Sequence, residues 1–227
     1  MAAAAELRAL LSARATVAAI FASAPSQDDF LAHLRAQQGI DWPRVSIFHL
    51  DEYIGLSPTH PASFRRYLRE HLVQHVPAKE FFELDGQAPD LEAECDRYAA
   101  LLNRHEPAMA AIGIGENGHL AFIDPANCDF DDARQVRAVE LDEVCRIQQV
   151  HDGVFSSLEH VPRRALSMTI PAIFRAPRIV VNVPGSTKRE AVKAALDGPI
   201  GEACPASVLR RHTQATLYLD EDSAALL

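Results

Sequence analysis

The chain has 227 residues, of which 48% are hydrophobic and 23% charged, a composition typical of globular proteins. Its formal net charge of −9 argues against general affinity for nucleic acid, because neutralising phosphates needs a basic face. The four cysteines are widely separated without a CxxC pair, so we expect neither a zinc site nor a disulfide framework, and a reduced, cytoplasmic protein.

The amino-terminal segment MAAAAELRALLSARATVAAIF is apolar, but Glu6, Arg8 and Arg14 interrupt every run of membrane-spanning length. We therefore expect no membrane contact, and predict a helix followed by a strand at 16–22. The turn-like SAPSQ, residues 23–27, closes this strand, and the amphipathic DDFLAHLRAQQ predicts a helix at 28–38.

Four further apolar runs predict strands that end in polar residues: VSIFHL at 45–50, AMAAIGI at 108–114, RIVVNV at 178–183 and TLYLDED at 216–222. A helical pattern, REAVKAALDG, follows the third of these. Alternation of apolar strands with helices predicts an α/β fold, a doubly wound, mostly parallel, Rossmann-like sheet with helices on both faces. No linker or internal repeat divides residues 1–227, so we expect a single domain.

Ligands of such sheets bind beyond the carboxyl ends of the strands, so the loops SAPSQ, DEY, GENGH and PGSTK are expected to form one cleft. The GENGH loop lies within GIGENGHLAF, residues 113–122, which has the GxGxxG spacing of a dinucleotide-binding loop. That fingerprint needs a long helix directly after the glycines. Here IDPANCDFDD, with Pro125, leaves room for scarcely one helical turn, so no nucleotide cofactor is expected. Gly115 and Gly118 instead let the backbone turn sharply and approach a ligand.

Two groups of side chains suggest acid–base chemistry. The glycine loop presents Asn117 and His119, and Asp124 lies five residues beyond the histidine, where a carboxylate could orient the imidazole. Alternatively, His119 satisfies only backbone groups of its loop. Asp51 and Glu52 follow the strand at 45–50 and point in different directions, because successive side chains of a strand alternate. Asp51 is the candidate base in a desolvated cleft, whereas Glu52 faces the substrate or caps the following turn.

An anion site is expected at PGSTK, where Lys188 lies in the first turn of a helix. A cation there is unfavourable with the helix dipole unless an anionic ligand is bound. Ser23, Ser26 and Gln27 of SAPSQ could donate hydrogen bonds to the same anion, although their loop lacks glycine. Ordinary helix capping is the alternative for Lys188 and Ser26.

Three other features favour structural roles. Arg65, Arg66 and Arg69 lie along one side of a predicted helix at 63–72, which is typical of a solvated face. Trp42, beside a proline, is expected to pack in the interior. His49 is expected in the core or the cleft wall.

With DEY, GENGHLAF and PGSTK in this order on an α/β sheet, the chain resembles the glucosamine-6-phosphate deaminase family, which shares its fold with the 6-phosphogluconolactonases. The resemblance runs from SAPSQ to TLYLDED, and FHLDEYIGLSPTHPASF with GIGENGHLAF is its most specific part. It implies a reaction without cofactor or metal, in which glucosamine 6-phosphate and water become fructose 6-phosphate and ammonium.

The resemblance also implies roles for individual residues. Asp51 moves a proton between C2 and C1 of the opened sugar, and His119 handles the ring-oxygen proton during ring opening. Asp124, where the best-known members have Glu, tunes the histidine. Asn117 occupies a position that is Asp or Asn in the family, and Lys188 binds the sugar phosphate.

The chain departs from the family pattern at several points. SAPSQ replaces a glycine-rich phosphate loop, Ile123 replaces a common Asn, and CRIQQVHDGVF offers His151, with Arg146 before it, where many members bind phosphate with an arginine. The elements that support hexamers in some members are not visible, so we expect a monomer or small homo-oligomer. Lactone hydrolysis, action on galactosamine 6-phosphate and a silent sugar-phosphate-binding regulator are the alternatives, and the intact FHLDEYIG favours the deaminase.

Overall fold

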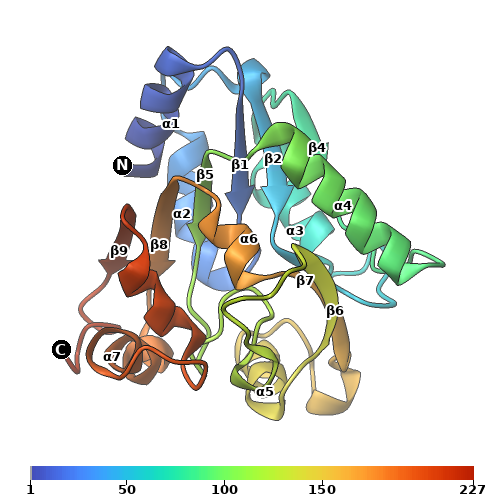
Figure 1. Ribbon diagram of the computed structural model, residues 1–227, viewed down its shortest axis with the longest axis vertical. Coiled ribbons are helices and arrows are strands. Elements are labelled where there is room, and N and C mark those ends of the chain that lie inside the picture. Colours follow the sequence, from blue (N-terminus) through green and yellow to red (C-terminus); the bar gives the residue numbers. More distant parts are fainter. Residues whose placement is uncertain (1) are drawn as a thin grey trace.

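The computed structural model describes residues 2–227 (Figure 1). Its helices are α1 (Ala2–Ala13), α2 (Asp28–Arg35), α3 (Phe64–His71), α4 (Leu91–His105), α5 (Glu143–His151), α6 (Ile170–Phe174) and α7 (Arg189–Asp197). Its strands are β1 (Val17–Phe21), β2 (Val45–His49), β3 (Asp51–Tyr53), β4 (Glu80–Phe82), β5 (Met109–Ile112), β6 (Val136–Glu140), β7 (Arg164–Met168), β8 (Arg178–Val183) and β9 (Ala215–Leu219).

The main sheet has six strands in the order β4-β2-β1-β5-β8-β9, and every neighbouring pair is parallel. The five strands predicted from apolar runs are present as β1, β2, β5, β8 and β9, which confirms the α/β fold. The strand order changes direction between β1 and β5, because β2 lies on one side of β1 and β8 on the far side of β5. Ligands of open α/β sheets bind at such a switch point.

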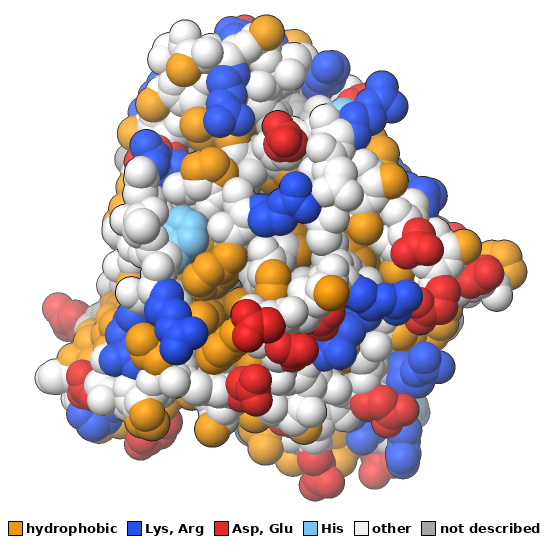
Figure 2. All heavy atoms as spheres, viewed as in Figure 1, with side chains coloured by type: hydrophobic (Ala, Val, Ile, Leu, Met, Phe, Trp, Pro, Cys, Tyr) orange, Lys and Arg blue, Asp and Glu red, His pale blue; other side chains and the backbone are white. Residues whose placement is uncertain are grey.

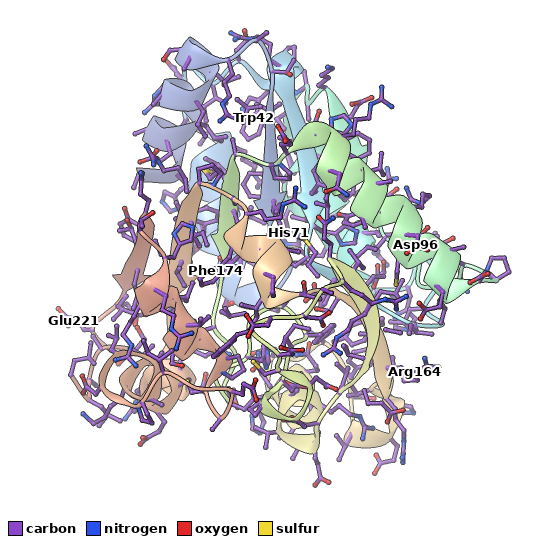
Figure 3. The ribbon with its side chains drawn as sticks, in the orientation of Figure 1. Trp42, His71, Asp96, Arg164, Phe174 and Glu221 are labelled. Atoms are coloured by element: carbon purple, nitrogen blue, oxygen red, sulfur yellow. The ribbon has the colours of Figure 1, made fainter. Side chains whose placement is uncertain are left out.

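Helices cover both faces of this sheet, as its continuous apolar strands predict. Successive residues of β1 alternate between two core layers: Val17, Ala19 and Phe21 pack with α1, α2 and α3, whereas Ala18 and Ile20 pack with α4, α6 and α7. Both predictions of interior packing are also confirmed. Trp42 is buried at the amino ends of the strands (Figure 3), and His49 is fully buried at the end of β2.

A second, antiparallel sheet with the order β3-β7-β6 was not predicted. The segment DEY forms its edge strand, with Asp51 opposite Ser167 and Tyr53 opposite Ala165. Three polar or aromatic residues carry no alternating pattern, so nothing in the sequence of β3 indicated a strand. The main chain thus passes from β2 of the first sheet directly into β3 of the second, and Asp51 lies where the two sheets meet.

No helix within residues 2–227 combines the length and the apolar character needed to cross a bilayer. Basic and acidic side chains are interspersed on the face of the molecule shown in Figure 2. The four cysteines are free thiols, and three of them are buried.

Candidate active site

A cleft of about 520 Å³, open mouth included, lies at the carboxyl ends of β1, β2, β5 and β8. Residues from the loops after all four strands line it, as the strand topology predicts. Seven of the twelve candidate residues are among the lining side chains: Ser23, Ser26, Gln27, Asp51, Gly115, His119 and Lys188. The other five, Glu52, Asn117, Gly118, Asp124 and His151, lie behind or beside the cleft.

The glycine loop after β5 is followed by a single 3-10 turn, Pro125–Asn127, and not by a long helix. Its glycines serve the packing of His119 instead. A Cβ atom on Gly115 would lie 2.1 Å from Cε1 of the imidazole. Gly118 has a φ of +82°, and a Cβ there would lie 2.7 Å from Sγ of Cys204. Gly115 therefore allows the ring to lie directly against the backbone, and Gly118 allows the close approach of Cys204.

The side chain of Asn117 fixes the tautomer of His119. Its Nδ2 donates to Asp124 Oδ1 at 2.9 Å and to Asp142 Oδ2 at 2.8 Å, so its Oδ1 must face the imidazole, 2.7 Å from Nδ1. An acceptor at that position requires the proton on Nδ1. Because His119 lines the cleft, this leaves the unprotonated Nε2 to act on a bound molecule.

Asp124 completes this unit. It is fully buried, and its Oδ1 lies 3.2 Å from Nδ1 of His119, so the shorter aspartate reaches the ring. The main-chain N–H of Asp142 donates to Oδ2 at 3.0 Å. Burial works to raise the pKa of Asp124, but the bonds from His119 and Asn117 prevail and hold that pKa below its usual value. Asp124 is therefore an anion that orients the histidine.

Cys145 is the third potential metal ligand beside this pair. Ligand atoms of His119, Asp124 and Cys145 lie within 4.8 Å of one another, and all three residues are buried. However, the carboxylate oxygens of Asp124 are already occupied by His119, Asn117 and the backbone of Asp142. The hydrogen bonds favour an acid–base unit over a metal centre at this position.

Asp51 faces the cleft from the junction of the two sheets. It is 6% exposed, and among the described residues its carboxylate has no hydrogen-bond donor. Burial raises the pKa of Asp51 well above its usual value, and the neighbouring Glu52 adds to that shift. A carboxylate with these properties is suited to accept and return a proton.

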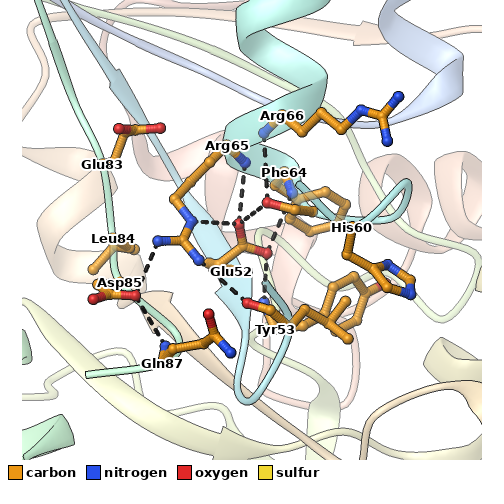
Figure 4. Close-up of polar contacts among 12 residues, drawn as sticks. Glu52, Tyr53, His60, Phe64, Arg65, Arg66, Glu83, Leu84, Asp85 and Gln87 are labelled. Carbon is orange, nitrogen blue, oxygen red and sulfur yellow. Dashed lines mark hydrogen bonds and ion pairs between the residues drawn. The ribbon is translucent and has the colours of Figure 1, made fainter. Parts of the chain in front are cut away.

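The structure corrects the assignment of Glu52 to substrate binding (Figure 4). Its side chain is completely buried and points away from the cleft. Five donors bond the carboxylate: the main-chain N–H groups of Tyr53, Phe64 and Arg65, Ser63 Oγ and Arg65 Nε. The alternative, that Glu52 caps the turn after its strand, holds for a different element: apart from the N–H of Tyr53, all of these donors belong to the start of α3.

The structure also corrects the prediction for Arg65. It was expected on a solvated face, yet it is 6% exposed and donates to Glu52 at 3.2 Å and to Asp85 at 2.9 Å. Arg66 and Arg69 follow the prediction and lie at the surface. Helical spacing could not reveal that Arg65 is buried while Arg66 and Arg69 lie at the surface. It does not show that the first turn of α3 packs on the buried carboxylate of Glu52.

The phosphate candidates line the same cleft as Asp51. Lys188 ends the 3-10 turn before α7 and is 4% exposed, and its ammonium makes no hydrogen bond or ion pair with the rest of residues 2–227. Burial lowers its pKa, against the influence of Asp152 and Glu116. Ser23 Oγ is buried without a partner. An unpaired cation beside an unpaired hydroxyl favours an anionic ligand.

The remaining SAPSQ residues are held in place by β8. Gln27 Nε2 donates to the carbonyl of Asn182 at 3.1 Å and to Ser26 Oγ at 3.2 Å. A Cβ on Gly113 would lie 3.1 Å from this nitrogen, so the glycine after β5 allows the close approach. Contacts with the segments of β8 and β5 thus hold the SAPSQ loop in place.

His151 does not line the cleft. It is exposed at the end of α5, with Nδ1 3.4 Å from Glu116 Oε2, and Arg146 bonds backbone carbonyls. The same helix instead contributes Gln148 and Gln149, which sequence reasoning missed. In the sequence, only their place beside His151 in IQQVH pointed to these two glutamines as cleft residues. The orientation of the helix, which the sequence does not give, decides which side chains face inward.

Comparison with known proteins agrees with this geometry. A family model described as glucosamine-6-phosphate isomerases/6-phosphogluconolactonase matches residues 2–218. The chain belongs to this family. Among its relatives, the glucosamine-6-phosphate deaminase of Lactobacillus delbrueckii subsp. bulgaricus is 35% identical over 83% of this chain and 78% of that protein. The deaminase of Exiguobacterium sibiricum is 38% identical over 83% and 73%.

Solved structures share the fold of this chain. A monomeric glucosamine-6-phosphate deaminase has a TM-score of 0.90 and 30% identity, covering 99% of this chain and 94% of that one. The 6-phosphogluconolactonase of Trypanosoma brucei has a TM-score of 0.76 at 19% identity, covering 99% and 94%. The latter likeness establishes the common fold alone.

Proposed function

We propose that the chain is a glucosamine-6-phosphate deaminase that converts glucosamine 6-phosphate and water into fructose 6-phosphate and ammonium. The observation that carries the proposal is the meeting of three groups in one cleft: the unpaired Asp51, the oriented His119 and the unpaired Lys188. Deaminase relatives at 35% to 38% identity support the same activity. We also propose that the chain acts as one domain and as a monomer, like the solved deaminase it resembles.

Each group has one task in this proposal. Lys188 binds the phosphate with Ser23, Ser26 and Gln27, and so fixes the far end of the sugar. His119 Nε2 takes the proton of the anomeric hydroxyl and returns it to the ring oxygen, which opens the ring, while Asp124 stabilises the imidazolium. Asp51 then moves the C2 proton to C1, the step that joins isomerisation to loss of the amine.

Hydrolysis of 6-phosphogluconolactone is the second candidate, because the fold and the glycine-loop histidine serve both reactions. It does not need a base for a carbon-bound proton. A desolvated carboxylate with a raised pKa, as at Asp51, therefore favours the deaminase.

The test is to give the purified protein glucosamine 6-phosphate and measure ammonium and fructose 6-phosphate. Asp51→Asn should abolish exchange of the C2 proton with solvent in deuterated water and leave sugar-phosphate binding nearly intact. Asp96→Asn, an exposed aspartate on α4 (Figure 3), is the matched control. Lactone hydrolysis without ammonium release would refute the proposal, and unchanged exchange in Asp51→Asn would remove Asp51 from its role.

A further inference from the structure

Figure 4 shows the ion pair between Arg65 and Glu52, the residue that directly follows the cleft-lining Asp51. Their side chains are 7% and 0% exposed. Within residues 2–227, no other pair of an arginine or lysine with a carboxylate has both side chains less than one-tenth exposed. Removing two charges from water costs several kcal/mol per ion, so such a pair is weak evidence for stability. The position of the ion pair beside Asp51 suggests a role in the active site rather than in stability.

The ion pair holds the backbone of β3, the strand that carries Asp51. Glu52 is the middle residue of β3, opposite Leu166, and its carboxylate bonds the N–H groups of Tyr53, Phe64 and Arg65. Because side chains alternate along a strand, anchoring Glu52 beneath the sheet turns Asp51 to the cleft side. Within residues 2–227, the carboxylate of Asp51 itself accepts no hydrogen bond that could hold it.

Arg65 ties three segments to this anchor. Its Nε donates to Glu52 at 3.2 Å, its Nη1 to Asp85 at 2.9 Å and its Nη2 to the carbonyl of Leu56 at 3.3 Å. A Cβ on Gly86 would lie 2.0 Å from the carbonyl of Tyr53, so the segment after β4 packs closely on β3. The guanidinium thereby joins α3 to β3, to the loop after β3 and to the loop after β4.

The charge of Arg65 also matters for Asp51. His49, on the same side, is neutral because burial lowers its pKa to about 3. Lys188 and His119 line the same cleft as Asp51. The titratable and charged groups around Asp51 are Glu52 and Tyr53 of β3, His49 of β2, Arg65 of α3, Asp85 after β4, Tyr98 of α4, His119 and Asp124 after β5, Cys145 of α5, Asp152 after α5, and Lys188 before α7. Arg65 is the cation that offsets Glu52.

We propose that Arg65 is a positioning residue for proton transfer at Asp51, acting through Glu52. It holds β3 so that Asp51 faces the substrate, and it neutralises the adjacent carboxylate so that Asp51 can still ionise in a buried site. This inference rests on the proposed deaminase function for its catalytic meaning. The effect of Arg65 on the protonation of Asp51 does not depend on the proposed function.

The test uses two substitutions that should shift the pKa of Asp51 in opposite directions. Arg65→Gln leaves Glu52 without its cation, so the acid limb of kcat/KM should move to higher pH by about one unit or more. Glu52→Gln removes the negative neighbour and should move the limb to lower pH. The double variant, Arg65→Gln with Glu52→Gln, should have a pH profile of kcat/KM close to that of the wild type. Arg65→Lys keeps the positive charge, so its pH profile should also stay close to that of the wild type. Arg66→Gln, at the next position and exposed, is the control and should shift nothing.

Carbon-13 NMR of aspartate carboxyl groups, assigned with Asp51→Asn, follows Asp51 without any turnover. Opposite shifts in Arg65→Gln and Glu52→Gln support the proposal, whereas shifts of the same sign, or lost activity at unchanged pKa, overturn it. Opposite NMR shifts in a protein that does not deaminate glucosamine 6-phosphate would support the positioning role and refute the proposed function. If Arg65→Gln does not fold, Glu52→Gln must still lower the pKa of Asp51, and Arg65→Lys must leave it near the wild-type value.

Discussion

Substitution of Gly115 by alanine should disable the histidine without touching a catalytic group. The new Cβ would lie 2.1 to 2.3 Å from three atoms of the His119 ring. Carbon atoms separate to about 3.5 Å, so the imidazole must withdraw by more than about 1 Å. A displacement of about 1 Å at a reacting group costs about 100-fold in rate, or about 2.7 kcal/mol of transition-state stabilisation.

The assay is steady-state formation of ammonium and fructose 6-phosphate, with unfolding in urea measured in parallel. We expect kcat/KM of Gly115→Ala to fall by about 100-fold while the variant remains folded. Gly201→Ala is the matched control, since a Cβ at that glycine meets no atom within 4 Å. A folded Gly115→Ala protein with wild-type kcat/KM would show that contact between the loop backbone and the ring does not position His119.

Three other changes test the remaining parts of the site. Lys188→Met should raise KM by about 10- to 100-fold with little change in kcat, because a bond from a charged donor contributes about 1.5 to 3 kcal/mol; an unchanged KM would move the phosphate elsewhere. Ser23→Ala should raise KM about fivefold at unaltered stability, because its buried hydroxyl has no protein partner to lose; a marked loss of stability would contradict this role. His49 has a pKa of about 3 in the folded protein and about 6.5 when unfolded, so the unfolded state binds one more proton between these values. The stability gained from a neutral His49 is complete above about pH 6.5 and is lost as the pH falls towards 3. His49→Gln should therefore flatten the pH dependence of the free energy of unfolding by about 1.4 kcal/mol per pH unit between about pH 4 and 6, measured in urea, and an unaltered slope would refute a neutral His49.

The parts of the fold that could be predicted are those in which local sequence and tertiary environment agree. Strands buried on both faces are continuous apolar runs, and the loops after them meet because parallel strands end at one edge. The antiparallel sheet could not be predicted, since β3 has three residues and owes its extended form to pairing with β7. Gln149 was missed because its inward orientation depends on a 2.7 Å bond from Tyr53, remote in sequence. Arg65 was misassigned for the same reason, because its burial depends on Glu52.

The amide of Asn117, held between two carboxylates, determines where protons can travel. An amide cannot accept a proton on one side and release it on the other, and Asp124 is held as an anion. The inner face of the imidazole is therefore closed to proton exchange with the protein interior. Any proton that His119 removes from a bound sugar must leave by the nitrogen through which it entered, and returns to that sugar or to water in the cleft. Ring opening and ring closure then share a single proton path, through Nε2 of His119.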